Sequence, residues 1–296
     1  MNKCHAVFFV LCMLLCKTTN AQKKETFDCG AKITTQSYLE IAQEMIKKAK
    51  DSNYNCPSQP SMTLDCETLL KSGNTKSKVY TVWPKSRVLD EKPVEVYCDM
   101  ETEGGGWTVI QRRGNFSRAK DYFFQDWEAY KNGFGNVEED FWLGNNNIFA
   151  LTNQRLYSLR FDLKDVEGNK RYALYDSFWI DDESHKYTLH VTGYTGDAGD
   201  SLISSHNNHK FSTKDQDNDT EPKVNCAQTY KGGWWYSACH ASNLNGLYLR
   251  GKHESYADGV VWHSWKGHHE SMDTVEIKIR PKNFRKTTVD LDVTPQ

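Results

Sequence analysis

The stretch at 215–246 constrains this chain more than any other, and it reads DQDNDTEPKVNCAQTYKGGWWYSACHASNLNG. It opens with aspartates at 215, 217 and 219, and carboxylates are the hard oxygen ligands that Ca²⁺ prefers. Cys226 and Cys239 follow, with aromatic residues between them and His240 beside them. Two cysteines this close in a secreted chain can close a short loop with a disulfide. The layout predicts a metal-braced loop beside an aromatic pocket, which indicates recognition rather than catalysis.

The first 21 residues have the pattern of a secretory signal peptide. Lys3 supplies a positive charge, Ala6 to Cys16 form an apolar run, and small residues up to Ala21 suit a cleavage site. The run is too short to cross a bilayer, and no other stretch approaches the roughly 18 apolar residues that a span needs. We therefore expect a secreted, extracellular protein without membrane insertion. A retained membrane anchor is the alternative.

The cysteine content agrees with that compartment. Six cysteines follow the signal peptide, and an even number in a secreted chain indicates disulfides. Zinc binding is the competing interpretation, but no C-x₂-C pair occurs. The pairing stays open at this point. The six are Cys29, Cys56, Cys66, Cys98, Cys226 and Cys239.

The charge balance argues against one class of partner. The chain has 296 residues and a formal net charge of −2 at pH 7. Nucleic-acid binding needs a strongly basic face, so we expect no nucleic-acid partner. The length suits one or two domains with a sizeable core.

Residues 22–60 differ in character from the rest. Apolar residues recur at helical spacing between Tyr38 and Ala49, with charged residues between them, which predicts one helix. Cys29 and Cys56 flank it. The helix either packs on its own domain or mediates self-association, locked by disulfides between chains. A Cys29–Cys56 pair within one chain is also possible.

From Cys66 onward, alternating apolar and polar residues predict β-strands. The pattern occurs at Val94–Cys98, Trp107–Gln111, Tyr157–Leu163, Tyr187–Val191 and Val275–Ile279. Short helices are predicted at Asp126–Asn132 and Asn147–Leu151. Because strands and helices do not alternate regularly, the pattern indicates an α+β domain with antiparallel strands. Regular periodicity fades between Gly196 and Trp265, which is typical of a functional segment.

The sequence contains no recognisable catalytic motif. Histidines gather at 253, 263, 268 and 269, but there is no H-E-x-x-H for a zinc hydrolase. No G-x-S-x-G occurs, and every cysteine after the signal peptide can be paired. The acidic loop is not an EF-hand, because Thr220 and Cys226 stand where that loop needs Gly and Glu. Taken alone, the loop could equally be a solvated acidic turn. We predict a binding protein and not an enzyme.

Two sequons fit N-x-[ST], at Asn115 and Asn218. Asn115 follows a turn-like Arg-Gly and is expected to carry a glycan. Asn218 lies inside the predicted metal loop, where a bulky glycan would fit poorly, so we expect it to stay unmodified.

Longer motifs match one family closely. They are VYCDM at 96–100, GGGWTVIQRR at 104–113, GFG at 133–135, FWLGN at 141–145, GDSL at 199–202 and CHASNLNG at 239–246. On these motifs, residues from about 66 to 281 resemble the fibrinogen-related domain family, and within it most resemble ficolins and tachylectin-type invertebrate lectins. The resemblance implies an α+β fold: a fibrinogen C-terminal-like domain with an antiparallel sheet, short helices and a largely irregular calcium- and ligand-binding subdomain.

The expected organisation has four parts. They are a signal peptide at 1–21, a helical self-association segment at 22–60, a fibrinogen-related domain at 61–282 with its ligand-binding subdomain at about 190–280, and a polar tail at 283–296.

The resemblance also implies how the cysteines pair and where calcium binds. It pairs Cys66 with Cys98 and Cys226 with Cys239. It places Ca²⁺ on the carboxylates of Asp217 and Asp219, with main-chain carbonyls near Glu221 and Lys223. The loop is one residue longer than the usual ficolin loop, so the carbonyl of Val224 could replace that of Lys223.

The resemblance places an acetyl pocket beside the calcium loop. Aromatic walls suit a methyl group, and a main-chain N–H suits the acetyl carbonyl. The family also has a cis peptide before the second loop cysteine. The matching pocket positions in this chain are Tyr230, Ala238, Cys239, His240, Tyr256 and His268. Without the resemblance, the two tyrosines would be read as cover for the core.

This chain departs from the family pattern in two places. His268 stands where tachylectin-type lectins present a tyrosine, and an imidazole is smaller, more polar and able to add pH dependence. The collagen-like arm of ficolins is absent. Multivalency would then come from residues 22–60 or from contacts between domains.

These features lead to one functional expectation and one alternative. The chain is expected to be a secreted, calcium-dependent lectin that binds acetyl groups of N-acetylated glycans, of the N-acetylglucosamine or N-acetylgalactosamine type, on microbial or cell surfaces. Because so small a group buries few atoms, useful binding would need a homo-oligomer. The alternative is a fibrinogen-like module that binds peptides or protein surfaces without lectin activity.

Overall fold

The structure, a computed structural model, describes residues 63–85 and 92–284 together with Gln43 and Lys47. The chain divides into two units, Met1–Pro60 and Ser61–Gln296. Of the first unit only Gln43 and Lys47 are described, and both are helical and exposed. The predicted signal peptide, most of the self-association helix with Cys29 and Cys56, and the tail beyond Phe284 lie outside the described residues.

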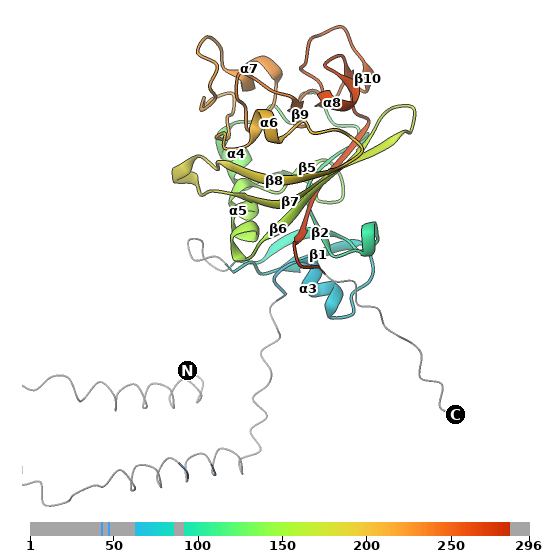
Figure 1. Ribbon diagram of the computed structural model, residues 1–296, viewed down its shortest axis with the longest axis vertical. Helices are drawn as coiled ribbons and strands as arrows, with labels where there is room; N and C mark the ends of the chain where they lie inside the picture. The colour runs from blue at the N-terminus through green and yellow to red at the C-terminus, as the bar shows by residue number, and fades with distance from the viewer. Residues whose placement is uncertain (1–42, 44–46, 48–62, 86–91, 285–296) are drawn as a thin grey trace, which may run out of the picture. The chain divides into compact units, whose positions relative to one another are not determined.

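A nine-stranded antiparallel sheet forms the centre of the second unit (Figure 1). Its main path runs β1-β2-β3-β13-β6-β7-β8, and β4 and β5 pair beside β3. The antiparallel α+β class predicted from the sequence is therefore confirmed. The strands are β1 (Lys78–Val82), β2 (Val94–Asp99), β3 (Trp107–Arg113), β4 (Phe134–Gly135), β5 (Phe141–Trp142), β6 (Tyr157–Lys164), β7 (Lys170–Ile180), β8 (Leu189–Gly196) and β13 (Thr274–Pro281).

Four predicted strands are present as β2, β3, β6 and β13, but the predicted strand at Tyr187–Val191 is displaced. β8 begins only at Leu189. Tyr187 has φ of +50°, a left-handed conformation that cannot continue a strand, and it follows the short 3-10 helix η2 (Glu183–His185). The long strand β7 was not predicted, and it joins β6 to β8.

The described helices are short. α4 begins after Asp126, whose carboxylate accepts from the N–H of Ala129, and α5 is longer than the sequence pattern indicated. α5 packs against β7. The helices are α3 (Cys66–Lys71), α4 (Trp127–Asn132), α5 (Asn145–Gln154), α6 (Ile203–His206), α7 (Cys226–Tyr230) and α8 (His263–Lys266), with a second 3-10 turn at η1 (Thr102–Gly104).

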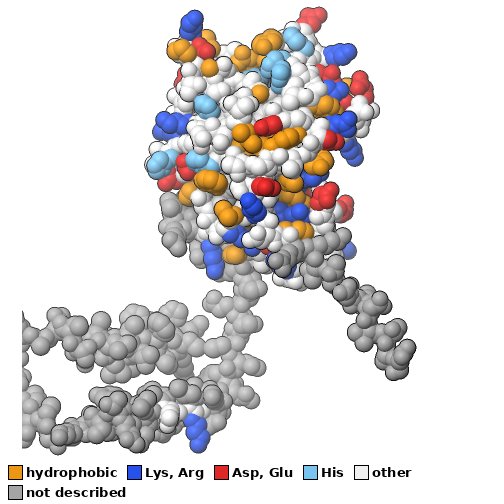
Figure 2. Space-filling view, in the orientation of Figure 1, with side chains coloured by type: hydrophobic (Ala, Val, Ile, Leu, Met, Phe, Trp, Pro, Cys, Tyr) orange, Lys and Arg blue, Asp and Glu red, His pale blue; other side chains and the backbone are white. Residues whose placement is uncertain are grey.

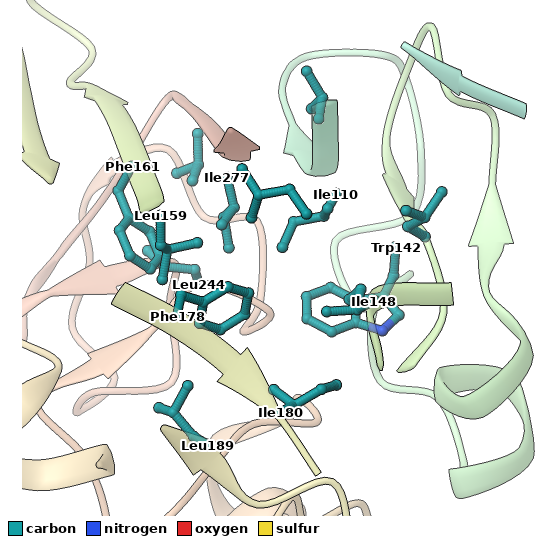
Figure 3. Packing of buried hydrophobic residues seen from close by; sticks show 14 of the residues in the cluster. Ile110, Trp142, Ile148, Leu159, Phe161, Phe178, Ile180, Leu189, Leu244 and Ile277 are labelled. Carbon is teal, nitrogen blue, oxygen red and sulfur yellow. The ribbon is translucent and has the colours of Figure 1, made fainter. Parts of the chain in front are cut away.

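The hydrophobic core lies against one face of the sheet. Strand residues Leu159, Phe161 and Phe178 point into it with Ile277, and Trp142 of β5 and Ile148 of α5 belong to the same cluster (Figure 3). Side chains on one strand face alternate with those on the other, so the apolar face of each strand meets this core. Burying each such side chain stabilises the fold by roughly 1.5–3 kcal/mol.

Lys278 lies on the opposite face of β13 and is almost fully buried among carboxylates. Its Nζ lies 2.7 Å from Asp99, 2.8 Å from Asp162 and 2.8 Å from Glu276. These partners hold the pKa of Lys278 above its usual value despite the opposing effect of burial. A buried charge is tolerated when it is paired in this way.

Between β8 and β13 the chain forms only small elements. β9 (Ser242–Asn243) pairs with β11 (Val261–Trp262), and β10 (Gly251–Lys252) pairs with β12 (Glu270–Ser271). Together with α6, α7 and α8 they gather at the end of the sheet that lies opposite α3 and β1 (Figure 1). None of the helices in the described residues is long and apolar enough to cross a membrane.

Candidate binding site

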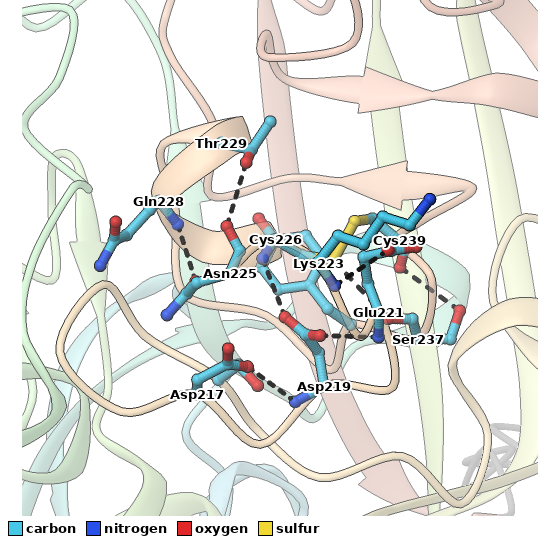
Figure 4. Close-up of a disulfide and its surroundings, with 12 residues drawn as sticks. Asp217, Asp219, Glu221, Lys223, Asn225, Cys226, Gln228, Thr229, Ser237 and Cys239 are labelled. Carbon is cyan, nitrogen blue, oxygen red and sulfur yellow. Dashed lines mark hydrogen bonds between the residues drawn. A yellow bond between two sulfur atoms is a disulfide. The ribbon is translucent and has the colours of Figure 1, made fainter.

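The acidic loop and the loop before β9 are joined by a disulfide. Cys226 starts α7, whose N-terminus is capped by Asn225, and it is bonded to Cys239 with an S–S distance of 2.00 Å (Figure 4). The peptide bond between Ala238 and Cys239 is cis. This disulfide and the Cys66–Cys98 disulfide at α3 and β2 are the pairs that the family resemblance implies.

The acidic loop folds around the carboxylate of Asp219. One of its oxygens accepts from the N–H of Cys226 at 2.8 Å, and the other accepts from the N–H of Glu221 at 2.9 Å (Figure 4). The carboxylate of Asp217 lies on the same loop and accepts from the N–H of Asp219 at 3.2 Å. Burial first, and the neighbouring Asp217 carboxyl second, raise the pKa of Asp219 to about 6. Two carboxylates that repel one another in this way would be relieved by a shared cation.

The oxygen donors of this loop fit a calcium ion. Ca²⁺ takes about six to eight oxygen ligands, including carboxylates and main-chain carbonyls. Among the residues that the structure describes, no three His, Cys, Asp or Glu side chains converge at metal-binding distance. A cation held by Asp217 and Asp219 would therefore need additional oxygens, and the carbonyls of Glu221 and Lys223 lie on the same loop.

Asp215 has a different partner from the other two aspartates. Its Oδ1 accepts from the N–H of Trp127 at 2.9 Å and from the hydroxyl of Thr213 at 2.7 Å. Asp215 therefore ties the start of the loop to the first turn of α4, away from the pair at Asp217 and Asp219.

The four aromatic residues proposed for the pocket lie in one continuous row. The rings of Tyr230 and His240 meet edge to face, with centroids 4.5 Å apart. His240 and His268 follow at 5.8 Å, and His268 and Tyr256 at 5.1 Å. The row links α7, the loop before β9, and the two segments on either side of α8. Tyr256 is 60% exposed, so the row runs from the interior to the surface.

His240 is neutral at physiological pH. Burial lowers its pKa to about 3, and the nearby His206 and His268 act in the same direction. Both ring nitrogens are buried, and the main-chain carbonyl of Ala257 opposes the effect of burial on the pKa, but neither nitrogen makes a hydrogen bond of good geometry among the described residues. A buried polar atom without a partner is costly, so a ligand group or water that met these nitrogens would be favoured.

His268 stands in a group of histidines at this end of the domain. Its ring lies 4.3 Å from that of His263, and His269 contacts Tyr256 at 5.5 Å. Burial first, and then His263 and His269, lower the pKa of His268. Figure 2 shows histidine side chains near the end of the domain that carries α7 and α8.

Main-chain donors are available beside the aromatic row. The N–H groups of Cys239 and His240 donate to no main-chain carbonyl in residues 63–85 and 92–284. Ala238, on the other side of the cis bond, is exposed. The structure thus brings all six predicted pocket residues into one region, next to the acidic loop.

Several residues that support this region had no functional signal in the sequence. The amide of Asn243, which is fully buried, donates to the carbonyl of Tyr230 at 2.9 Å and to that of Gly259 at 3.2 Å. It therefore holds the segment that bears Tyr230 against the segment that follows Tyr256. A single Asn in a Ser-Asn-Leu-Asn-Gly stretch resembles an ordinary turn residue, so only the structure identifies it.

Two β3 side chains hold the turn after Asn243. Arg113 donates to the carbonyls of Leu244 at 2.8 Å and Gly246 at 3.0 Å, and Gln111 donates to Leu244 at 3.1 Å. Arg113 is buried with its guanidinium over the ring of Phe123, 3.9 Å from the centroid. The central sheet is thus linked directly to the pocket loops.

The two sequons have different surroundings. Asn115 is exposed, as a glycan acceptor must be. The amide of Asn218 donates inward to the carbonyl of Phe211 at 2.8 Å. Glycosylation of Asn115 and the absence of a glycan on Asn218 both stay predictions.

Curated relatives share most of the chain. Techylectin-5A of Tachypleus tridentatus is 50% identical over 290 residues, which cover 96% of this chain and 98% of that protein. A Techylectin-like protein of Phoneutria nigriventer is 51% identical over 242 residues, which cover 82% of this chain and 92% of that protein.

Solved structures share the fold. The fibrinogen-like globe domain of human ANGPTL2 matches with a TM-score of 0.70 and 43% identity, over 74% of this chain and 99% of that one. Lamprey fibrin D-dimer, solved with the peptide Gly-His-Arg-Pro-amide, matches with a TM-score of 0.69 and 29% identity, over 95% of this chain and 90% of that one.

The family model for the C-terminal globular domain of fibrinogen beta and gamma chains matches residues 62–282. Together with the relatives, this match confirms the resemblance read from the motifs, and it places the chain among binding modules rather than enzymes. The chain belongs to the fibrinogen C-terminal domain family.

Proposed function

We propose that this protein is a secreted, calcium-dependent lectin that binds the acetyl group of N-acetylated glycans. The observation that carries the proposal is the row of Tyr230, His240, His268 and Tyr256 beside the N–H groups of Cys239 and His240, which donate to no main-chain carbonyl in the described part of the chain. The names of the two Techylectin relatives support a lectin function. N-Acetylglucosamine and N-acetylgalactosamine are the ligand types, presented on microbial or cell surfaces.

The chemistry of the pocket suits an uncharged acetamido group. A methyl group gains from contact with the faces and edges of aromatic rings, and an amide carbonyl gains from a main-chain N–H. His240 carries no charge at neutral pH, because its pKa is lowered to about 3. The side chain of His240 therefore gives the pocket a polar surface without a positive charge.

Calcium would act through the shape of the pocket rather than by touching the ligand. Asp219 binds the N–H of Cys226, and Cys226 is bonded to Cys239, the neighbour of His240. The N–H of Thr220 also donates to the carbonyl of Ser237 at 3.2 Å. A cation on Asp217 and Asp219 would fix the loop that carries these contacts.

A single pocket of this size binds weakly, since an acetyl group offers few atoms. Linked sites raise the apparent affinity without new contacts. We therefore include in the proposal a homo-oligomer, assembled through residues 22–60 or through contacts between domains.

A glycan array probed with the full-length protein in calcium and in EDTA tests this function. We expect binding to N-acetylated glycans in calcium, competition by free N-acetylglucosamine, and loss of binding in EDTA. No glycan bound in calcium would refute the lectin assignment.

Variants assign the binding to the pocket. Tyr230→Ala and His240→Ala should abolish retention on an N-acetylated resin. Tyr80→Ala is the matched control, because Tyr80 is a half-buried tyrosine on β1, at the other end of the sheet. Retention of the two pocket variants to the level of the control would show that the site lies elsewhere.

A peptide-binding role is the second candidate, favoured by the lamprey fibrin relative, which was solved with a bound tetrapeptide. The same experiment separates the two. Binding that is displaced by peptides with a free amino terminus, and not by acetylated sugars, would favour this alternative.

A further inference from the structure

His206 touches both ends of the loop that carries His240. It is the last residue of α6 and is completely buried. Its Nδ1 lies 2.8 Å from the carbonyl oxygen of Trp235, and its Nε2 lies 3.1 Å from the N atoms of both Ala241 and Ser242. One imidazole thus connects the segment that enters the loop 235–242 with the segment that leaves it.

These contacts fix the protonation state of the ring. A carbonyl oxygen can only accept, so Nδ1 must carry the hydrogen and donate it to Trp235. Main-chain N–H groups can only donate, so Nε2 must offer its lone pair to Ala241 and Ser242. His206 is therefore a neutral imidazole in the Nδ1–H tautomer, and burial agrees with this by lowering its pKa to about 4.

The residues between the two ends include Cys239 and His240, which form part of the proposed pocket. The disulfide holds the middle of the loop at Cys239. His206 holds the ends, and Ala241, to which it is bonded, directly follows His240. The rings of Trp234 and His206 also meet edge to face, with centroids 6.4 Å apart. The position of the His240 ring is thus set from a residue that has no exposed surface.

We propose that His206 is a positioning residue for the binding pocket, which it serves by clasping the loop that presents His240 without touching the ligand. This inference rests on the proposed function. The Nδ1–H donor of His206 holds the main chain at Trp235, and its Nε2 acceptor holds the main chain at Ala241 and Ser242, so the segment between them is kept in one arrangement.

The binding test uses full-length variants and calorimetric titration with N-acetylglucosamine. His206→Leu removes all three hydrogen bonds and should weaken binding about tenfold or more. His206→Gln keeps an acceptor and a donor and should restore binding to within about threefold of wild type. His209→Leu is the control, because His209 lies three residues further on and its side chain makes no hydrogen bond within the described residues.

Wild-type affinity for His206→Leu would overturn the inference, and so would equal losses in the glutamine and leucine variants. Failure of the wild-type protein to bind any acetylated ligand would refute the proposed function instead, and it would leave the next measurement intact.

The second measurement needs no variant. Proton–nitrogen NMR of the wild-type protein should show His206 in the Nδ1–H tautomer, with slow hydrogen exchange at the amides of Ala241 and Ser242. An Nε2–H tautomer, or fast exchange at both amides, would overturn the positioning role of His206 even if His206→Leu failed to fold.

Discussion

The imidazole of His240 stands perpendicular to the ring of Tyr230, with an interplanar angle of 90° and centroids 4.5 Å apart. Edge-to-face contact is a favoured arrangement for aromatic rings and holds both in place. Tyr230 comes from the end of α7 and His240 from the loop across the disulfide. The affinity for a ligand that contacts both rings would therefore depend on the contacts that hold α7 and this loop together.

Calcium removal should uncouple the acidic loop from the pocket. We expect EDTA to lower the midpoint of thermal unfolding, because a ligand that binds only the native state stabilises it by about 2.7 kcal/mol at a hundredfold excess over its dissociation constant. Asp219→Asn should abolish the calcium-dependent shift, as measured by calorimetry.

Asp215→Asn is the control for that experiment. Both hydrogen bonds of Asp215 reach the same oxygen, so an asparagine can keep them and the calcium response should persist. A lost response in both variants would mean that the metal assignment within the loop is wrong.

The two disulfides should differ in their effect on binding. Replacing Cys226 and Cys239 with Ala, or Cys66 and Cys98 with Ala, should each lower the free energy of unfolding by about 3 kcal/mol, because each bond restricts the unfolded chain. Only the first replacement should remove retention on an acetylated resin at a temperature where both variants are folded. Equal retention in the two would contradict the idea that Cys239 positions the pocket.

His268→Tyr should shift the ligand preference of the pocket. A tyrosine offers a larger apolar face than an imidazole, so we expect severalfold tighter binding of N-acetylglucosamine, about 1 kcal/mol in titration calorimetry. His269→Tyr is the neighbouring control, because His269 contacts Tyr256 but not His240. If both variants gained affinity equally, the effect would not be specific to His268 and its contact with His240.

Acid should destabilise the domain through its buried neutral histidines. The unfolded chain takes up protons near the ordinary histidine pKa of about 6.5, whereas the folded pKa of His206 is about 4. The stability that this group contributes is therefore complete above pH 6.5 and falls as the pH drops toward 4. The total loss is about 1.4 kcal/mol for each pH unit between the folded and the unfolded pKa.

His206→Gln should flatten that loss. Thermal unfolding at saturating calcium, at pH 7.5 and pH 4.5, would measure it in the variant and the wild type. An equal loss in the two proteins would assign the acid sensitivity to other groups.

Local patterns in the sequence predicted the parts of the fold that depend on local chemistry. Alternation identified β2, β6 and β13, and the carboxylate of Asp126 begins α4 where the pattern placed a helix. β7 was missed because a register shift against β6 interrupts its alternation: the buried residues are Ala173 and Tyr175 and then Phe178 and Ile180. The pattern predicts a strand at Tyr187, because the spacing of apolar residues does not reveal that its backbone is left-handed.

The site divides in the same manner. Family motifs pointed to Tyr230 and His240, and the structure brings them into contact. His206, Asn243 and Arg113 were not identified, because each acts on main-chain atoms across long stretches of sequence. A polar residue that will be buried looks the same in a sequence as one that will face water.

Three bonds from Gln111 and Arg113 reach the main-chain carbonyls of Leu244 and Gly246, and a fourth runs from Gln111 to the side-chain oxygen of Asn245. Main-chain atoms are present whatever side chain a position carries. Mutation could therefore exchange much of the surface chemistry of the neighbouring loops while their attachment to β3 stayed intact. In a domain built this way, the ligand preference can change during evolution while the fold stays the same.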